Sequence, residues 1–247
     1  MNTRAKIKKI LHLQHHNHHE KVDIHTILER KPMAKRQERM KHFGAVVLFI
    51  TICMVTFGQK NTLLLYGPND NGKTYTSLEE ALASTDTVYR LKLTKLPQRD
   101  SIPEELFKLT ELRELSIKGC KLNIVNQNIM QLKHLRILNL DRNKLLRLPN
   151  AIGELQELEL LIISRNMIEI LPDSIAKLSN LHTIDAWDNP MYVLPESIIR
   201  LEKSLKTIDL RQIPLSKWEY EAMEKLLPKT DILFTDICEC ENRRDHN

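Results

Sequence analysis

A repeating pattern of leucines from residue 88 onward most constrains what this chain can fold into. Six segments follow the template L-x-x-L-x-L-x-x-N, with substitutions, and they begin at Val88, Leu112, Leu135, Leu158, Leu181 and Leu205. Successive starts are therefore 24, 23, 23, 23 and 24 residues apart. A fixed period of this length indicates a stack of similar units, because no single unit can bury its leucines alone.

A second apolar block follows the first in most of these segments. The blocks LPNAIGEL (148–155), LPDSIAKL (171–178) and LPESIIRL (194–201) repeat one another, and IPEELFKL (102–109) has the same form. In L-x-x-L-x-L the last two leucines are two positions apart, so in a strand both face the core. Proline is the second residue of each of these blocks and suits the first turn of a helix. The Ile or Leu that follows it and the final Leu, three positions apart, share one helical face.

These blocks resemble the leucine-rich repeat family, in the subclass whose repeats end L-P-x-x-I-x-x-L, and they look like those of bacterial exported members. The resemblance covers about residues 88–215. It implies an α/β fold, a curved solenoid with a parallel sheet on its concave face, short helical or extended segments on its convex face, and a cap at each end. It also implies a module that binds a protein or other macromolecule on the concave sheet.

The ninth template position is an asparagine in three repeats. The resemblance implies a buried ladder, in which side chains bond backbone groups of neighbouring turns, formed by Asn143, Asn166 and Asn189. The position is filled elsewhere by Leu96, Cys120 and Ile213. We therefore expect the ladder only in the middle repeats. In the second repeat Asn126 stands where proline is expected, which predicts an irregular convex segment.

Both ends of such a stack need a cover. Residues 76–88 predict a short helix with Thr76 or Ser77 as N-cap and with Leu78, Leu82 and Val88 facing inward. Residues 216–228 predict a second helix, whose buried side would hold Trp218, Met223, Leu226 and Leu227. The predicted order is an N-terminal cap at 59–87, six repeats at 88–215, a cap helix and edge strand at 216–237, and a tail at 238–247.

Positive charge is concentrated ahead of the repeats. The net charge is +7 over residues 1–42, zero over 43–58 and −2 over 59–247. The apolar run 43–58 is shorter than the roughly 20 residues of a membrane span and suits the core of a signal peptide, with small residues before Gln59 for cleavage. From Met40 it is a complete signal peptide; from Met1 it is a signal anchor with a basic tail held inside.

We favour Met40 as the start, with Met33 as a further candidate, and either interpretation exports the repeats. We expect residues 59–247 to be periplasmic, on the cell surface or secreted, or else anchored with the repeats on the non-cytoplasmic side. Residues 1–42 hold a patch with His15, His16, His18 and His19. No carboxylate or cysteine frame surrounds the patch, so we expect a disordered or untranslated segment rather than a metal site.

The residues between the buried leucines of each strand point away from the core, including the seventh-position residues Asp141 and Ser164. Apolar members gather at the centre of the array, and arginines stand beside them. This composition is typical of interaction hot spots, although β-branched residues also suit strands that bind nothing. The candidate partner-binding residues on the concave face are Ile137, Leu160, Ile162, Trp187, Arg142, Arg165, Asn139 and Asp185.

Residues 67–74 read GPNDNGKT, which matches the nucleotide-binding pattern G-x-x-x-x-G-K-[ST]. A P-loop needs a partner strand that ends in a magnesium-binding Asp, and further strands to bury its own. The chain instead passes directly from the helix at 76–85 into the first repeat. We interpret the match as the turn into the N-terminal cap and keep nucleotide binding as a distant alternative.

No arrangement of nucleophile and base, and no His-Glu zinc pattern, stands out in the sequence. Cys120 is expected to be an inert buried thiol, and Cys238 and Cys240 leave a local disulfide or free thiols open. We expect no enzyme activity, no cofactor, no metal, no nucleic-acid partner and a monomer, with membrane contact only if residues 43–58 are retained. A surface adhesion protein that recognises host or matrix molecules is the alternative to a general binding module.

Overall fold

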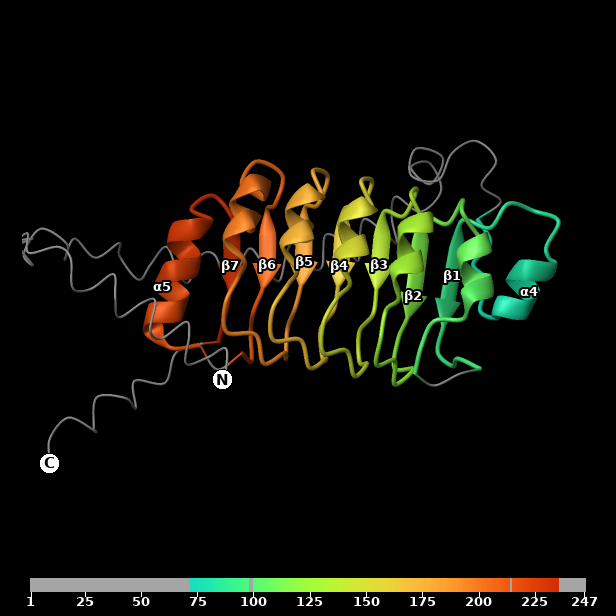
Figure 1. The fold of residues 1–247 in the computed structure, drawn as a ribbon, viewed down its shortest axis with the longest axis horizontal. Helices are drawn as coiled ribbons and strands as arrows, with labels where there is room; N and C mark the ends of the chain where they lie inside the picture. Colours follow the sequence, from blue (N-terminus) through green and yellow to red (C-terminus); the bar gives the residue numbers. More distant parts are fainter. Residues whose placement is uncertain (1–71, 98–99, 214, 236–247) are drawn as a thin grey trace, which may run out of the picture. The chain divides into compact units, whose positions relative to one another are not determined.

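The computed structural model describes residues 72–97, 100–213 and 215–235. Its strands form one open sheet of seven parallel strands in chain order (Figure 1). The strands are β1 (Arg90–Leu93), β2 (Glu114–Ile117), β3 (Ile137–Asn139), β4 (Leu160–Ile162), β5 (Thr183–Asp185), β6 (Thr207–Asp209) and β7 (Asp231–Leu233). The predicted α/β solenoid with a parallel sheet is therefore confirmed.

Each strand pairs with the next at equivalent template positions. Ile137 pairs with Leu160, for example, and Leu138 with Leu161. The period-2 alternation of a strand then places one leucine or isoleucine per repeat in a single buried column, made of Leu91, Leu115, Leu138, Leu161, Ile184 and Ile208. The core is continuous because every turn covers the apolar side of its neighbour.

A row of short 3₁₀ helices runs parallel to the sheet (Figure 1). They are η2 (Glu104–Lys108), η3 (Gln127–Gln131), η4 (Asn150–Glu154), η5 (Asp173–Lys177) and η6 (Glu196–Leu201). In four of them the N-cap residue is a proline. The sequence predicted proline in the first turn of the helix, and the structure places it one residue earlier. The Pro149 carbonyl, for example, accepts the first hydrogen bond of η4 from the N–H of Ile152 at 3.1 Å.

The second repeat corrects one prediction. Its convex segment is a regular 3₁₀ helix, η3, rather than an irregular stretch. The Asn126 side chain accepts a hydrogen bond from the N–H of Asn128 at 3.0 Å and donates one to Glu104 at 2.8 Å. Asparagine is a strong N-cap, so it replaces the proline of the other repeats with a side-chain cap.

Buried amides connect the middle repeats at the ninth template position. Asn166 accepts a hydrogen bond from the N–H of Leu145 at 3.1 Å and donates to the carbonyls of Leu140 and Ile163 at 3.0 and 2.9 Å. Asn143 and Asn189 make the equivalent bonds one repeat earlier and one repeat later. The three side chains thus satisfy backbone groups that the sheet ladder leaves free.

Helices cover the two ends of the array. At the first repeat, α4 (Leu78–Ala83) begins at the N-cap Ser77 and buries Leu78 and Ala81, while Tyr75 forms a bridge to Leu91. Leu82 was predicted to face inward, but it is 40% exposed. The prediction is wrong because Leu78 and Ala81 already fill the inward side of this short helix.

At the last repeat, α5 (Lys217–Leu226) begins with a capping box between Ser216 and Glu219. Met223 and Leu227 are buried and Leu226 is half-buried. Trp218 was predicted to join them, but it is 77% exposed. Five residues separate Trp218 from Met223, which turns the helix by about 140° away from the buried face.

Candidate binding surface

The face of the sheet opposite the core, called here the outer sheet face, carries the third- and fifth-position side chains of each repeat. Ile137 and Leu160 pair in register, and Ile162 pairs with Asn139. Ile137, Leu160 and Ile162 are half-buried, so these aliphatic side chains pack beside one another and keep one side open. Polar residues flank them on both sides, with Glu114 on β2 and Thr183 on β5. The sheet therefore brings together three of the apolar residues that the sequence predicts.

Trp187 lies just beyond β5 and is held by the arginine of the preceding repeat. The guanidinium carbon of Arg165 lies 4.7 Å from the centre of the Trp187 ring, within the range of a cation–π contact. The N–H of Arg165 also donates to the Trp187 carbonyl at 2.8 Å. Side chain and backbone therefore fix the tryptophan beside the sheet.

A buried carboxylate holds Arg165 in that position. Arg165 donates from Nε and Nη2 to the two carboxylate oxygens of Asp141 at 2.8 and 2.7 Å. Lys118 pairs with the same carboxylate at 3.0 Å, and Ser164 donates to it at 3.2 Å. A bidentate arginine–carboxylate pair fixes orientation as well as charge. We call Asp141, Lys118, Arg165 and Trp187 the clamp.

Asp141 and Ser164 are buried although the seventh position faces out of the sheet, which corrects the prediction for these two residues. Each is 2% exposed, because Arg165 folds over them both. Lys118 and Arg211 at the same position are exposed. Burial alone raises the pKa of the Asp141 carboxyl, but hydrogen bonds and charge from Arg165 and Lys118 outweigh it and hold that pKa below its ordinary value. The same bond raises the pKa of Arg165. The sequence held one indication of this contact, because Asp141 and Arg165 are separated by about one repeat of the array.

Asn139 and Asp185 occupy equivalent fifth positions, and their side chains shape the turns that follow. Asn139 Oδ1 accepts from the N–H of Asp141 at 2.9 Å, and Asp185 Oδ1 accepts from the N–H of Trp187 at 3.3 Å. Asp209 does the same for Arg211 at 3.1 Å. Such bonds from Asn or Asp to the backbone two residues on stabilise turns. These residues thus help to orient Asp141 and Trp187.

Asp185 and Asp209 pair in register on neighbouring strands. Burial raises the pKa of Asp185, and the negative charge of Asp209 raises it further. Asp209 is itself paired with Arg211, whose Nη2 lies 2.6 Å from Asp209 Oδ2. The C-terminal part of the outer sheet face therefore carries two neighbouring carboxylates, of which Asp209 is buried and neutralised by Arg211, in contrast to the aliphatic centre.

Arg142 differs from Arg165, although both occupy the eighth position. It has a φ of 57° and an exposed side chain, which makes no ion pair within the described residues. The structure therefore does not bring Arg142 into the clamp, and the second cation of that group is Lys118, which the sequence did not single out as a site residue.

Comparison with known proteins identifies the family. A sequence model described as "Leucine-rich repeat region" matches residues 98–229, more than half of the chain. The chain belongs to the leucine-rich repeat family. The structure of a leucine-rich repeat protein from Leptospira interrogans is similar at 27% sequence identity with a TM-score of 0.53, covering 67% of this chain and 49% of that one. The chain thus spans about half the length of that neighbour. No curated protein matches the sequence significantly.

Leucine-rich repeat domains are protein-interaction modules and typically have no enzymatic activity, so membership supports a protein partner. Among residues 72–97, 100–213 and 215–235, no group of three or more His, Cys, Asp or Glu is placed to hold a metal ion. The same part of the chain has no helix that is long and apolar enough to cross a membrane. The apolar run 43–58, the histidine patch and Cys238 and Cys240 lie outside the described residues, as do residues 67–71 of the GPNDNGKT segment.

The described end of that segment leads into this leucine-rich repeat array. Lys73, the lysine of the nucleotide-binding pattern, lies 3.0 Å from Glu80 and 4.2 Å from the centre of the Tyr75 ring. Tyr75 in turn pairs with β1, the first strand of the array. Lys73 thus contacts the N-terminal cap, and α4 that follows has only six residues.

Proposed function

We propose that this protein is a non-enzymatic binding module that recognises a macromolecular partner, a protein first of all, on its outer sheet face. The observation that carries the proposal is the half-buried trio Ile137, Leu160 and Ile162 beside the clamped Trp187. Hot spots in protein interfaces are enriched in tryptophan and arginine and surrounded by contacts that exclude water.

The fixed geometry of the clamp supports the same conclusion. An exposed tryptophan on a mobile side chain loses conformational freedom when a partner binds, and this loss weakens affinity. Arg165 and Asp141 hold Trp187 in place before binding, so that loss is reduced. The aliphatic trio presents a neighbouring apolar area of the kind that marks an interaction site rather than a set of scattered hydrophobic residues.

The test is a capture experiment with the full chain and two matched double variants. We expect Leu160→Asp with Trp187→Ala to lower capture of the partner at least tenfold. The control, Met130→Asp with Ile199→Ala, changes exposed apolar residues on the 3₁₀ row and should capture normally. Both variants should melt within a few degrees of the wild type. Capture that survives the first pair, or fails equally with the second, would contradict the proposed site.

Export is part of the proposal. The basic residues 1–42 and the apolar run 43–58 support a protein that is secreted, on the cell surface, periplasmic or membrane-anchored. The mass of the native mature protein distinguishes a chain that begins at Gln59 from one that keeps its apolar segment. A native chain recovered intact in the cytosolic fraction would contradict export.

Adhesion to host or matrix molecules is the second candidate and uses the same outer sheet face. Asp185, which is half-buried at the C-terminal part of that face and makes no ion pair within the described residues, favours a target with positive charge at that end. Direct binding of the purified chain to cell surfaces or immobilised matrix, lost in the Leu160→Asp, Trp187→Ala variant, distinguishes adhesion from recognition of one soluble protein. Nucleotide binding remains the distant third, and a thermal-shift assay with ATP and magnesium tests it directly.

A further inference from the structure

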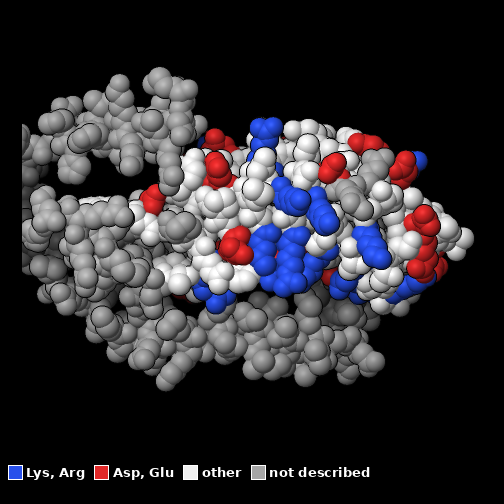
Figure 2. Space-filling view, turned by 90° about the horizontal axis from the view of Figure 1, so that it is seen from below, with Lys and Arg blue, Asp and Glu red and all other residues white. Residues whose placement is uncertain are grey.

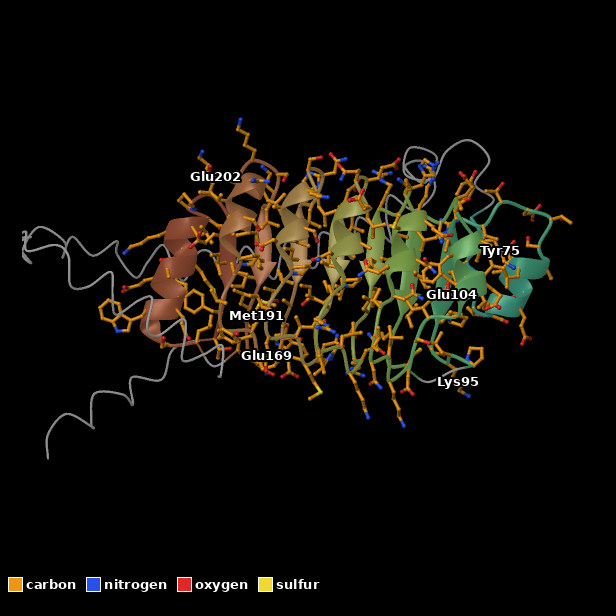
Figure 3. The ribbon with its side chains drawn as sticks, viewed as in Figure 1. Tyr75, Lys95, Glu104, Glu169, Met191 and Glu202 are labelled. Atoms are coloured by element: carbon orange, nitrogen blue, oxygen red, sulfur yellow. The ribbon has the colours of Figure 1, made fainter. Side chains whose placement is uncertain are left out.

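The loops that follow β2, β3 and β4 form a surface distinct from the outer sheet face. We call residues 118–124, 141–147 and 164–170 the carboxyl edge, because they continue from the carboxyl ends of these strands. Figure 3 shows Glu169 on this edge, Lys95 on the same side of the array after β1, and Glu202 on the opposite side. Lysines and arginines gather over the middle of this side of the molecule (Figure 2).

The carboxyl edge is strongly basic. Its three loops hold six Lys or Arg residues and two acidic ones, a net charge of +4, whereas residues 59–247 as a whole have a net of −2. One of the two acids, Asp141, is buried and already bonded to Lys118 and Arg165. Four exposed cations make no ion pair within the described residues: Lys121, Arg142, Lys144 and Arg147. The edge therefore presents unbalanced positive charge to solvent.

Long aliphatic side chains are exposed between these cations. Ile124 and Leu146 are each 61% exposed, and the third loop exposes both Met167 at 52% and Ile170 at 42%. Polar or charged residues neighbour them along the chain, such as Asn123, Arg147 and Glu169. The edge thus combines exposed apolar side chains with a surplus of cations.

The backbone of the edge is fixed. The N–H of Lys144 donates to the Leu122 carbonyl at 2.8 Å, and the N–H of Met167 donates to the Leu145 carbonyl at 2.9 Å. Lys121 and Arg142 adopt left-handed backbone with φ of 60° and 57°. The same conformation recurs at Arg165, Asp188 and Gln212, so it is a regular feature of the turns that follow the strands. The cations are therefore displayed from a rigid row of turns.

We propose that the carboxyl edge is a peripheral membrane-binding surface that docks on an anionic lipid bilayer. Lysine and arginine near an anionic leaflet attract it, and aliphatic side chains among them enter the boundary between headgroups and acyl chains. Lysine is depleted in protein interfaces, whereas this edge exposes Lys121 and Lys144 on the same loops as its aliphatic side chains. Docking through this edge leaves the outer sheet face beside the bilayer and open to a partner.

Lipid contact by this edge is tested by fluorescence on the full chain, with Cys53, Cys238 and Cys240 replaced by serine in every sample. An environment-sensitive dye is attached at Leu146→Cys or, as the control on the 3₁₀ row, at Ile199→Cys. With vesicles of phosphatidylcholine and phosphatidylglycerol, a lipid-borne quencher should quench the dye at position 146 and not at 199. Phosphatidylcholine alone should give no quenching at 146. Because both labels share the same residues 43–58, insertion of that apolar run does not produce the difference.

Charge dependence is tested by a matched pair of triple variants. Lys121→Gln with Lys144→Gln and Arg147→Gln should lower the vesicle partition coefficient attributable to the edge about a hundredfold, since each cation contributes about fivefold. The control, Lys108→Gln with Lys133→Gln and Lys203→Gln, removes three exposed cations from the 3₁₀ row and its turns and should leave quenching at position 146 unchanged. Gln212 is found at a φ of 57°, so glutamine is compatible with the left-handed turns of this edge.

Arg142 and Arg165 stay unchanged in these variants, so partner capture by the outer sheet face is measured separately in the same proteins. Equal quenching at positions 146 and 199, or equal loss in the two triple variants, overturns the proposal. Binding of the edge to polyglutamate without lipid quenching at position 146 also overturns it and assigns the surface to an acidic protein.

Discussion

Two adjacent turns of the array differ at the residue on which the chain bends. After β3, Asn143 accepts hydrogen bonds from the N–H groups of Cys120 and Leu122, both at 3.0 Å, and donates to the carbonyls of Ile117 and Leu140. After β2, the equivalent residue is Cys120, whose thiol lies 3.6 Å from the carbonyls of Leu93 and Lys118. An amide is thus replaced by a much weaker hydrogen-bonding group.

The difference shows that each asparagine side chain accepts hydrogen bonds from backbone N–H groups of the preceding repeat. The backbone at Cys120 is satisfied by Asn143 of the third repeat, so the ladder joins repeats two to three, three to four and four to five. The first repeat receives only the weak thiol contact at this position. Since a solenoid is stabilised by its nearest-neighbour interfaces, we expect the first repeat to open before the middle ones.

Removing a middle amide should have the largest effect. Asn166→Ala leaves the N–H of Leu145 and the carbonyls of Leu140 and Ile163 without their side-chain partners. Each buried unpaired group costs about 1–3 kcal/mol, so the free energy of unfolding should fall by about 3–5 kcal/mol. Urea denaturation followed by circular dichroism measures this change.

Asn180→Ala is the matched control for the ladder. Its side chain is exposed and donates only to the Gln156 carbonyl at 2.9 Å. We expect a loss below about 1 kcal/mol there. Similar losses in the two variants would show that the buried ladder does not stabilise the middle repeats.

The clamp should give a smaller effect that depends on pH. Asp141→Asn keeps the shape of the side chain but removes the charge that Arg165 and Lys118 share, and it should lower the free energy of unfolding by about 2 kcal/mol at pH 7. The pKa of Asp141 lies below its ordinary value in the folded protein. Its stabilisation is therefore present above about pH 4 and is lost as pH falls through the folded pKa.

The difference between wild type and Asp141→Asn should therefore narrow below about pH 4. Glu169→Gln makes the same change of charge at the same edge without a buried partner and should behave as the wild type throughout. Melting curves from pH 7 to pH 3 measure both. If the stability difference between wild type and Asp141→Asn stays constant with pH, Asp141 is not the group whose titration changes the stability.

The helix cap of the second repeat is expected to have a moderate effect. Asn126→Ala removes the cap of η3 and the bond to Glu104, and it should cost about 1 kcal/mol. Asn126→Pro should be close to neutral, because the φ of −79° suits proline and the other repeats use it here. Equal destabilisation by both substitutions in thermal melts would mean that the two kinds of cap are not equivalent.

The alternation of leucines made the strands and the buried column predictable from sequence, whereas the parallel sheet was expected through the family resemblance. The strands and the column depend on a local period, and a strand places its side chains on alternate faces whatever lies around it. The asparagine ladder was expected only through the family resemblance, since its bonds reach backbone groups one repeat away. Periodicity thus indicates which face a residue occupies but not which group it contacts.

The clamp was not predicted in this way, and the buried side of the C-terminal cap helix was predicted wrongly at Trp218. Asp141 sits at a position that points out of the sheet, and it is buried only because Arg165 of the next repeat folds over it. Trp218 was misplaced because hydrophobicity, rather than its angle to Met223 on α5, was used to assign it. The first error concerns side-chain packing between elements, which a single sequence does not show directly. The second concerns the angle around a helix, which the spacing of Trp218 and Met223 does give.

The smallest effect is expected at the cysteine that opened this comparison. Cys120→Ala removes a thiol with weak contacts and should lower the free energy of unfolding by about 1 kcal/mol or less, well below Asn166→Ala. Burial raises the pKa of the Cys120 thiol, so its reaction with a thiol reagent at neutral pH requires local opening. If the first repeat opens first, dilute urea that leaves the middle repeats folded should raise the labelling rate of Cys120, because its thiol packs on the Leu93 carbonyl of that repeat. Asn143→Ala should raise the rate further by releasing the N–H groups of Cys120 and Leu122. A labelling rate that Asn143→Ala leaves unchanged would mean that the second repeat is held by its leucines alone.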